Sequence, residues 1–246
     1  MFMNLRFSGL VLSLSMLFSS SLAAEIENYF NSNRITFQQG DGFEVGDSRR
    51  NIWTLEHISG WNWGDLFFFY DRIDGLETDS LSYYTEFSPR FSLAPLGFEA
   101  RPPMVRDILL ASTLEKGSGG FKAYLAGPGV TWDLPKGMHL ESNLYLRDNP
   151  DLSGATWQFT TAWSLPFSLW AVDFLFDGYA DLRGSEGGNK GDLNFNPQLK
   201  VDLGKLVGYP QIIYAGVEYY HWNNKFGIEG VDERLLSPLL QAHYSY

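Results

Sequence analysis

Side chains that can bind or transfer groups recur at every second position in several stretches of this sequence. Between residues 138 and 148, His139, Glu141, Asn143, Tyr145 and Arg147 alternate with other residues. A tyrosine ring can stack on a flat solute, and carboxylates, amides and Arg can hydrogen-bond to its hydroxyl groups. Successive side chains of a β-strand point to opposite faces, so this spacing places all five on one face. The pattern predicts a polar face that could hold a small polar solute.

The same alternation in other segments gives a larger set of candidate binding residues. Any single ionisable member could equally form an ion pair that braces the wall, so the prediction concerns the set. The acids outnumber the basic members, which should disfavour phosphorylated solutes and admit neutral ones. The candidates are Glu56, Tyr84, Glu86, Arg90, Tyr145, Arg147, Asp173, Asp177, Tyr179, Asn194, Asn196, Lys200, Glu218 and Tyr220.

Covalent catalysis and metal binding find less support in the sequence. There is no Cys, which excludes a thiol nucleophile and thiolate ligands. The four histidines are His57, His139, His221 and His243, and none lies in a recognisable nucleophile or metal-ligand motif. We therefore predict no enzyme activity, no metal and no cofactor. The enzyme alternative is a lipid-hydrolysing barrel, which would need a Ser–His pair oriented by an acid or amide.

The first residues have the pattern of an export signal. Arg6 precedes a short apolar run over 10–18, and small residues follow at the position of a cleavage site. The run is too short for a membrane-spanning helix, which needs about 20 apolar residues. We predict a signal peptide over residues 1–23, cleaved near Ala23 or Ala24, followed by one domain over 24–246.

The rest of the chain consists of short alternating segments separated by turn residues. Their number is even, as a single-chain bacterial barrel requires. The fold class we predict is therefore all-β, a single 12-stranded antiparallel transmembrane β-barrel. The predicted strands are 33–39, 51–59, 65–73, 81–93, 105–116, 121–133, 138–148, 155–165, 168–182, 190–203, 211–222 and 235–246.

The apolar faces of these segments decide between a membrane barrel and a soluble sandwich. Phe, Tyr and Trp make up 16% of the chain, and they recur on the face opposite the polar one in nearly every segment. In residues 236–246 this face ends on the aromatic residue Tyr246. We predict that it faces lipid in a bacterial outer membrane. The formal net charge of −11 argues against nucleic-acid binding.

Several short motifs resemble one family of outer-membrane proteins. They are Thr-Leu-Glu-His at 54–57, Asp-Leu-Phe-Phe-Phe-Tyr at 65–70, Phe-Ser-Pro-Arg-Phe-Ser-Leu at 87–93 and Asn-Leu-Tyr at 143–145. In this order and spacing they resemble the nucleoside-specific channel-forming (Tsx-like) family, which includes the OmpK-type porins. The likeness spans essentially the whole chain after the signal, although each motif is short.

The resemblance implies a function, partners and three more residues that face the lumen. It implies passive, selective diffusion of nucleosides through a narrow lumen. The facing of 65–73 is ambiguous from alternation, and the resemblance places Phe68, Tyr70 and Arg72 toward the lumen. It also implies contact with outer-membrane lipid, recognition of the terminal strand and Tyr246 by the barrel assembly machinery, and possible use as a phage receptor. The alternative is a general or cation-preferring porin.

Overall fold

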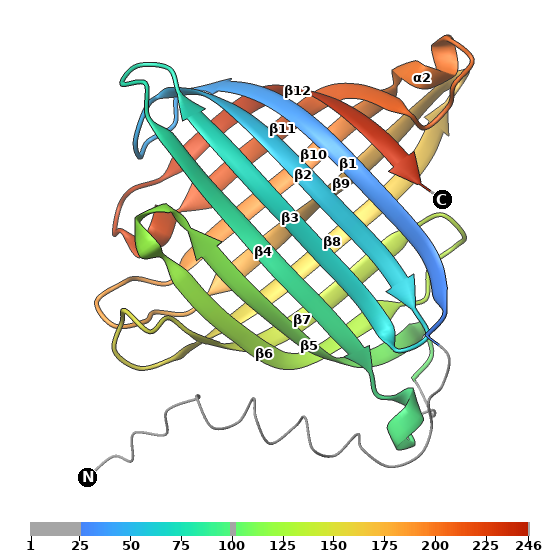
Figure 1. Ribbon diagram of the computed structural model, residues 1–246, viewed down its shortest axis with the longest axis horizontal. Coiled ribbons are helices and arrows are strands. Elements are labelled where there is room, and N and C mark those ends of the chain that lie inside the picture. The colour runs from blue at the N-terminus through green and yellow to red at the C-terminus, as the bar shows by residue number, and fades with distance from the viewer. Residues whose placement is uncertain (1–25, 99–101, 246) are drawn as a thin grey trace.

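The computed structural model describes residues 26–98 and 102–245, and its twelve strands close into one antiparallel barrel (Figure 1). Most strands alternate between outward apolar side chains and inward side chains that are mainly polar, which is the pattern that predicted them. The strands are β1 Asn28–Asp41, β2 Arg49–Trp61, β3 Gly64–Gly75, β4 Leu81–Ser92, β5 Val105–Gly117, β6 Lys122–Trp132, β7 His139–Asp148, β8 Thr156–Leu169, β9 Val172–Arg183, β10 Asp192–Asp202, β11 Ile213–Asn223 and β12 Glu233–Ser245.

Closure joins the first strand to the last. β1 pairs with β12 from Ser32 opposite Ser245 to Gln38 opposite Leu239, and every other strand pairs with its sequence neighbours. β1 therefore begins and β12 ends at the same rim, which we call the terminal rim. The opposite end of the barrel is called the distal rim. Closure leaves no strand edge unpaired, which a β-structure in lipid requires.

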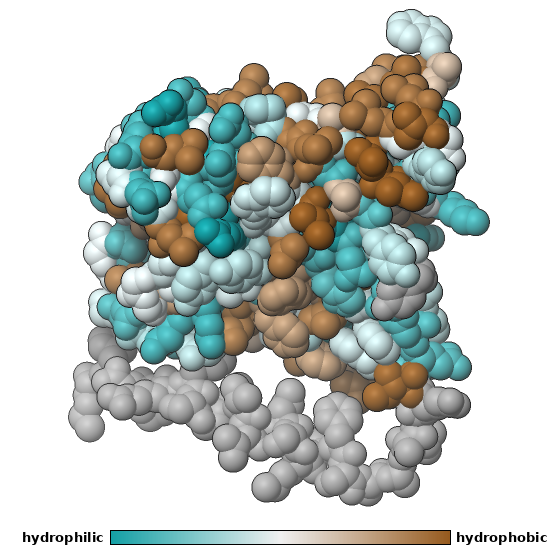
Figure 2. Space-filling model, turned by 45° about the horizontal axis from the view of Figure 1, so that its top comes forward, coloured by the Kyte–Doolittle hydropathy of each residue, from teal (hydrophilic) through white to brown (hydrophobic). Residues whose placement is uncertain are grey.

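The barrel is apolar outside and polar inside. Leu55, Leu144 and Leu240 are about half exposed on the outer wall, where Figure 2 shows apolar side chains over much of the visible face. By contrast, Arg147 and Lys200 are almost completely buried within the barrel. This distribution is the reverse of a soluble protein, and it fits a wall that contacts hydrocarbon.

Short helices occur only in the connections of the described chain. They are η2 Ala94–Leu96, η3 Ser118–Gly120, α2 Leu203–Leu206 and η4 Lys225–Gly227. Among the described residues, no helix is long and apolar enough to cross a membrane.

The predicted fold class and the number of strands are confirmed, with some boundaries corrected. The turn between the eighth and ninth strands was placed at 166–167, but both strands continue and the turn lies at Trp170 and Ala171. Phe167 and Phe174 stack in register there, which extends the ladder past Pro166. The predicted signal peptide and Tyr246 lie outside the described residues.

Candidate functional site

The inner wall of the barrel carries most of the predicted binding residues. β7 places Asn143, Tyr145 and Arg147 inside, where they are buried at 2%, 4% and 1% exposure. The other predicted residues on the inner wall are Glu56, Tyr84, Glu86, Arg90, Asp173, Asp177, Tyr179, Asn194, Asn196, Lys200, Glu218 and Tyr220. Their location follows the predicted alternation, whereas their role as solute contacts stays a prediction.

The prediction for β3 was wrong. Phe68 lies opposite the outward Phe87, and Tyr70 lies on the same outer face, as does the exposed Arg72. The inner face instead carries Phe67, Phe69 and Asp71, because Phe69 is opposite Glu86 and Asp71 is opposite Tyr84. Both faces of this strand are aromatic, so a period of two could not distinguish them.

Toward the terminal rim, the basic side chains of the lumen are neutralised by acids. The Arg90 guanidinium lies 2.6 Å from the Asp65 carboxylate and 2.8 Å from that of Glu141. Lys200 Nζ lies 2.7 Å from Asp177 Oδ2 and also donates to Gln241 Oε1 at 2.7 Å. These side chains are held by partners in the wall, so we interpret them as braces.

Toward the distal rim, Arg147 forms a second brace. Its Nη1 and Nη2 donate to the two oxygens of Glu115 at 2.5 and 2.7 Å, and Nη1 also donates to Gln158 Oε1 at 2.9 Å. Glu186, from the β9–β10 connection, lies 4.0 Å from Arg147 Nε. This bidentate pair links β5 to β7, across the intervening strand β6.

Between these braces lies a belt of four carboxylates whose hydrogen-bond donors are neutral. Thr54 donates to Asp71 at 2.6 Å, Tyr84 donates to Glu86 at 2.7 Å, and Thr160 donates to Asp181 at 2.5 Å. Gln38 and Gln198 donate to Glu218 at 2.5 and 2.8 Å. Among the described residues, no Lys, Arg or His forms a salt bridge with any of the four. We call Asp71, Glu86, Asp181 and Glu218 the acidic belt.

Tyr179 lies at the level of the acidic belt and interacts electrostatically with all four of its members. It points into the barrel, where its hydroxyl accepts a hydrogen bond from Asn194 Nδ2 at 3.3 Å, yet it keeps 38% of its surface accessible. The lumen therefore contains open space beside this ring. Asp71 and Asp181 are additions to the predicted set, and the only acid within the run 66–72 is the signal that marks Asp71.

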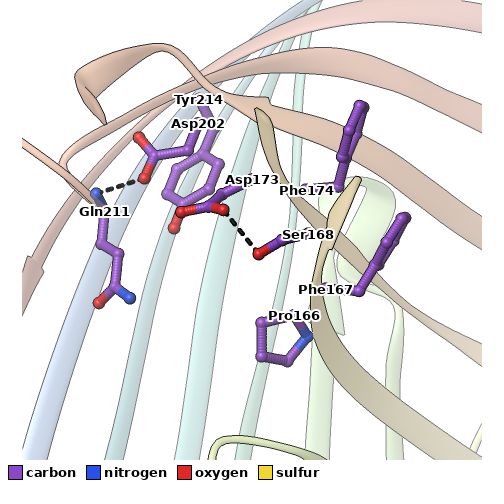
Figure 3. A pocket seen from close by; sticks show the side chains of 8 residues that line it. All are labelled: Pro166, Phe167, Ser168, Asp173, Phe174, Asp202, Gln211 and Tyr214. Carbon is purple, nitrogen blue, oxygen red and sulfur yellow. Dashed lines mark hydrogen bonds between the residues drawn. The ribbon is translucent and has the colours of Figure 1, made fainter. Parts of the chain in front are cut away.

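A separate pocket of about 190 Å³ lies at the terminal rim (Figure 3). Asp173 lines this pocket and accepts hydrogen bonds from Ser168 Oγ and from Lys205 Nζ, both at 2.7 Å. Tyr214 and Asp202 complete its polar side, and Phe167 and Phe174 lie on its apolar side. Asp173, predicted as one of the lumen candidates, therefore lies at the terminal rim and away from the acidic belt.

The outer wall near the terminal rim holds a hydrogen-bonded chain that the sequence reasoning missed. His57 Nε2 lies 3.0 Å from Ser59 Oγ, and His57 Nδ1 lies 2.9 Å from Asn33 Oδ1. Because an amide oxygen only accepts, Nδ1 carries the proton and Nε2 accepts from Ser59. The spacing His-x-Ser at 57–59 was its only signal in the sequence.

In these hydrogen bonds Ser59, His57 and Asn33 stand in the order of a nucleophile, a base and an orienting group. However, Ser59 has no exposed surface, and its Oγ also accepts from Trp61 Nε1 at 2.8 Å. An oxygen enclosed in this way has no path to an ester carbonyl. We therefore interpret these hydrogen bonds as a structural clamp, which holds Asn33 of β1 to His57 of β2. Among the described residues, no group of three or more His, Asp or Glu could hold a metal ion.

A closed antiparallel barrel with an apolar outer wall and a charged interior defines the chain as a bacterial outer-membrane β-barrel. No family model and no curated protein matches its sequence. Its fold is similar to that of outer membrane phospholipase A from Escherichia coli, with a TM-score of 0.50 and 11% identity over 93% of this chain and 96% of that one.

Two porins are also similar to the chain. One is the KdgM porin in complex with disordered oligogalacturonate, with a TM-score of 0.47 and 12% identity over 88% of this chain and 99% of that one. The other is the NanC porin, with a TM-score of 0.46 and 10% identity over 87% of this chain and 97% of that one. At such identities the likeness concerns the fold alone.

Proposed function

We propose that the barrel is a narrow channel through which small solutes diffuse passively across the outer membrane, and that nucleosides are its specific substrates. The observation that carries the proposal is the acidic belt, whose carboxylates have neutral donors and lie around the accessible ring of Tyr179. Membership of the Tsx-like family is part of this proposal.

The chemistry of the belt suits a neutral solute with a flat ring and hydroxyl groups. Carboxylate oxygens with free lone pairs accept hydrogen bonds from ribose hydroxyls. Stacking of a base on an aromatic side chain contributes roughly 1–3 kcal/mol. Contacts of this strength allow a solute to enter and still leave, as conduction requires. The phosphate of a phosphorylated nucleoside would meet no cationic partner among these four acids, which disfavours its passage.

Solute uptake into proteoliposomes tests the proposal. Adenosine should enter faster than a neutral sugar of similar mass and much faster than adenosine monophosphate. Replacing the belt acids in the double variant Asp71→Asn/Glu218→Gln should raise monophosphate entry relative to adenosine. Asp133→Asn is the matched control, because it removes one charge from an exposed position at the terminal rim. Equal entry of adenosine and the sugar would refute nucleoside selectivity.

The same belt also supports a second candidate, a cation-preferring general porin. Four carboxylates without cationic partners would attract small cations as well as admit neutral solutes. Reversal potentials in a salt gradient separate the two. A strong cation preference without any block of the current by adenosine would favour the general porin, whereas block by adenosine would favour the nucleoside channel.

A further inference from the structure

The connection between β1 and β2 places one of its side chains, Phe43, inside the barrel at the distal rim. We call residues 42–48 the mouth loop. Its Phe43 is 5% exposed and packs against the inward side chains Ile52 and Leu235. The ring also meets Tyr220 edge-on, with centroids 5.5 Å apart. A large aromatic side chain of a loop therefore occupies lumen space.

The side chains that surround Phe43 come from the first two strands and from the last part of the chain, which meet where the barrel closes. The Arg50 guanidinium lies 4.2 Å from the ring centroid and Lys225 Nζ lies 5.6 Å from it. Lys225 is in turn paired with Glu233 at 2.5 Å. Gly40 faces the ring so closely that an added Cβ would come within 2.5 Å of it. The lumen wall thus leaves a space that the ring fills.

A second attachment fixes the far end of the mouth loop. The Asp47 carboxylate accepts hydrogen bonds from the backbone N–H groups of Glu77 and Thr78 at 2.9 and 2.8 Å and from the Thr78 hydroxyl at 2.6 Å. These donors belong to the β3–β4 connection. The Thr78 hydrogen bonds lower the pKa of Asp47, so the carboxylate stays charged at neutral pH.

The loop is hinged as well as attached. Gly42 and Gly46 bracket residues 43–45 and have φ values of +95° and +79°, a region that favours glycine. An added Cβ at Gly42 would meet nothing within 4 Å, so there is free space beside this hinge. Further hydrogen bonds hold the loop, from Glu44 N–H to Glu233 Oε2 and from Ser48 N–H to Glu77 Oε2, both at 2.9 Å. All of these attachments are non-covalent, so a loop with glycine hinges can break them and move as a unit.

We propose that Phe43 is the size-selecting residue of the distal mouth and that the mouth loop carries it as a movable constriction, latched by Asp47 to Thr78. The proposal rests on the channel function, because it concerns what can enter the same lumen. With the latch closed, only small solutes pass beside the ring. Release of the latch lets the loop swing outward and admits larger ones.

Single-channel recording of the Asp47→Cys/Thr78→Cys variant tests the latch. The chain has no other Cys, so a disulfide can form only between these two. The oxidised channel should keep the small conductance and lack larger openings. Reduction leaves no latch, and the open fraction should rise about tenfold, which corresponds to about 1.4 kcal/mol.

Phe43→Ala tests the constriction without touching the latch. It should raise conductance and the size limit for neutral solutes in the absence of reductant, whereas Ile228→Ala, an exposed apolar residue of another distal connection, should change neither. Conductance that is unchanged in Phe43→Ala and independent of redox state would overturn the mouth-loop proposal and leave the channel intact. If none of the proteins conducts, Phe43→Ala included, the channel function itself is refuted.

Discussion

Arg147 offers the most direct test of the idea that buried ion pairs brace the lumen. Its side chain is 1% exposed and forms two hydrogen bonds to Glu115, which is itself 4% exposed. Arg147→Met keeps the bulk of the side chain but leaves Glu115 charged and unpaired inside the barrel. Breaking a buried pair on one side costs about 3–5 kcal/mol, and we expect a loss of unfolding free energy in this range.

A neighbouring carboxylate should increase this loss. Glu86 lies opposite Glu115 in the β4–β5 ladder and interacts electrostatically with both Glu115 and Arg147. Without the guanidinium, the two acids face one another with no cation between them. The double variant Glu115→Gln/Arg147→Met removes the stranded charge. We expect it to recover at least about 2 kcal/mol, because a buried ion pair replaced on both sides is often close to neutral in stability.

The measurement is equilibrium urea unfolding in lipid vesicles, followed by tryptophan fluorescence. Arg72→Met is the control, since Arg72 is exposed on the outer wall and pairs with Asp74 at 3.0 Å. Its loss should cost no more than about 1 kcal/mol. A cost below about 1 kcal/mol for Arg147→Met, or a double variant no more stable than the single one, would show that Arg147 does not brace the wall.

Three further outcomes follow from local geometry. Gly178→Ala should destabilise the barrel by about 1–3 kcal/mol in the same urea assay, because φ is +146° and an added Cβ would lie 2.3 Å from a carbonyl oxygen of β10. Gly188→Ala, with open space around it, should be silent. Ser59→Ala should cost roughly 1–2 kcal/mol by removing two hydrogen bonds, with adenosine uptake unchanged; slower uptake would contradict a clamp. The lowered pKa of Asp47 means that its hydrogen bonds stabilise the fold above the usual carboxyl range and are lost as pH falls through the lower folded value. Protection of the Thr78 amide from hydrogen exchange should therefore persist to more acidic pH than that usual range, and Asp47→Asn should abolish this pH dependence.

Strand number, closure and most facings follow from alternation alone. In β10 the outward Phe195 and Leu199 alternate with the buried Asn194, Asn196 and Lys200. Only one assignment of the two faces places the apolar side chains in lipid and the polar ones in the lumen. Such strands are predictable because a one-residue slip would place a charge in hydrocarbon.

β3 shows where alternation loses its information. Phe67, Phe68, Phe69 and Tyr70 are acceptable on either face, and only the register with β4 decides between them. Asp65 and Asp71, which share a face, could have decided it, because a carboxylate is much less costly in the lumen than in lipid.

The mouth loop and the acidic belt depend on contacts that no local pattern contains. Phe43 meets Tyr220 and Leu235 only because closure brings the last strands beside the first. Likewise, Glu218 has neutral partners because Gln198 lies opposite it on β10 and closure brings Gln38 of β1 within reach beyond β12. The residue types can be read from the sequence, but which residues contact one another depends on strand pairing and barrel closure.

The contacts across the barrel seam also bear on how the chain is assembled. Gln38 donates to Glu218 over a separation of 180 residues, and Gln241 donates to Thr36 over 205. Until β12 reaches β1, these two hydrogen bonds cannot form, and the polar groups that make them would be exposed to hydrocarbon in a partly inserted sheet. A stepwise intermediate in the bilayer is therefore costly, and its cost is relieved only at the last pairing. Assembly should then be limited by ring closure, and changes at the seam should slow insertion more than they weaken the finished barrel.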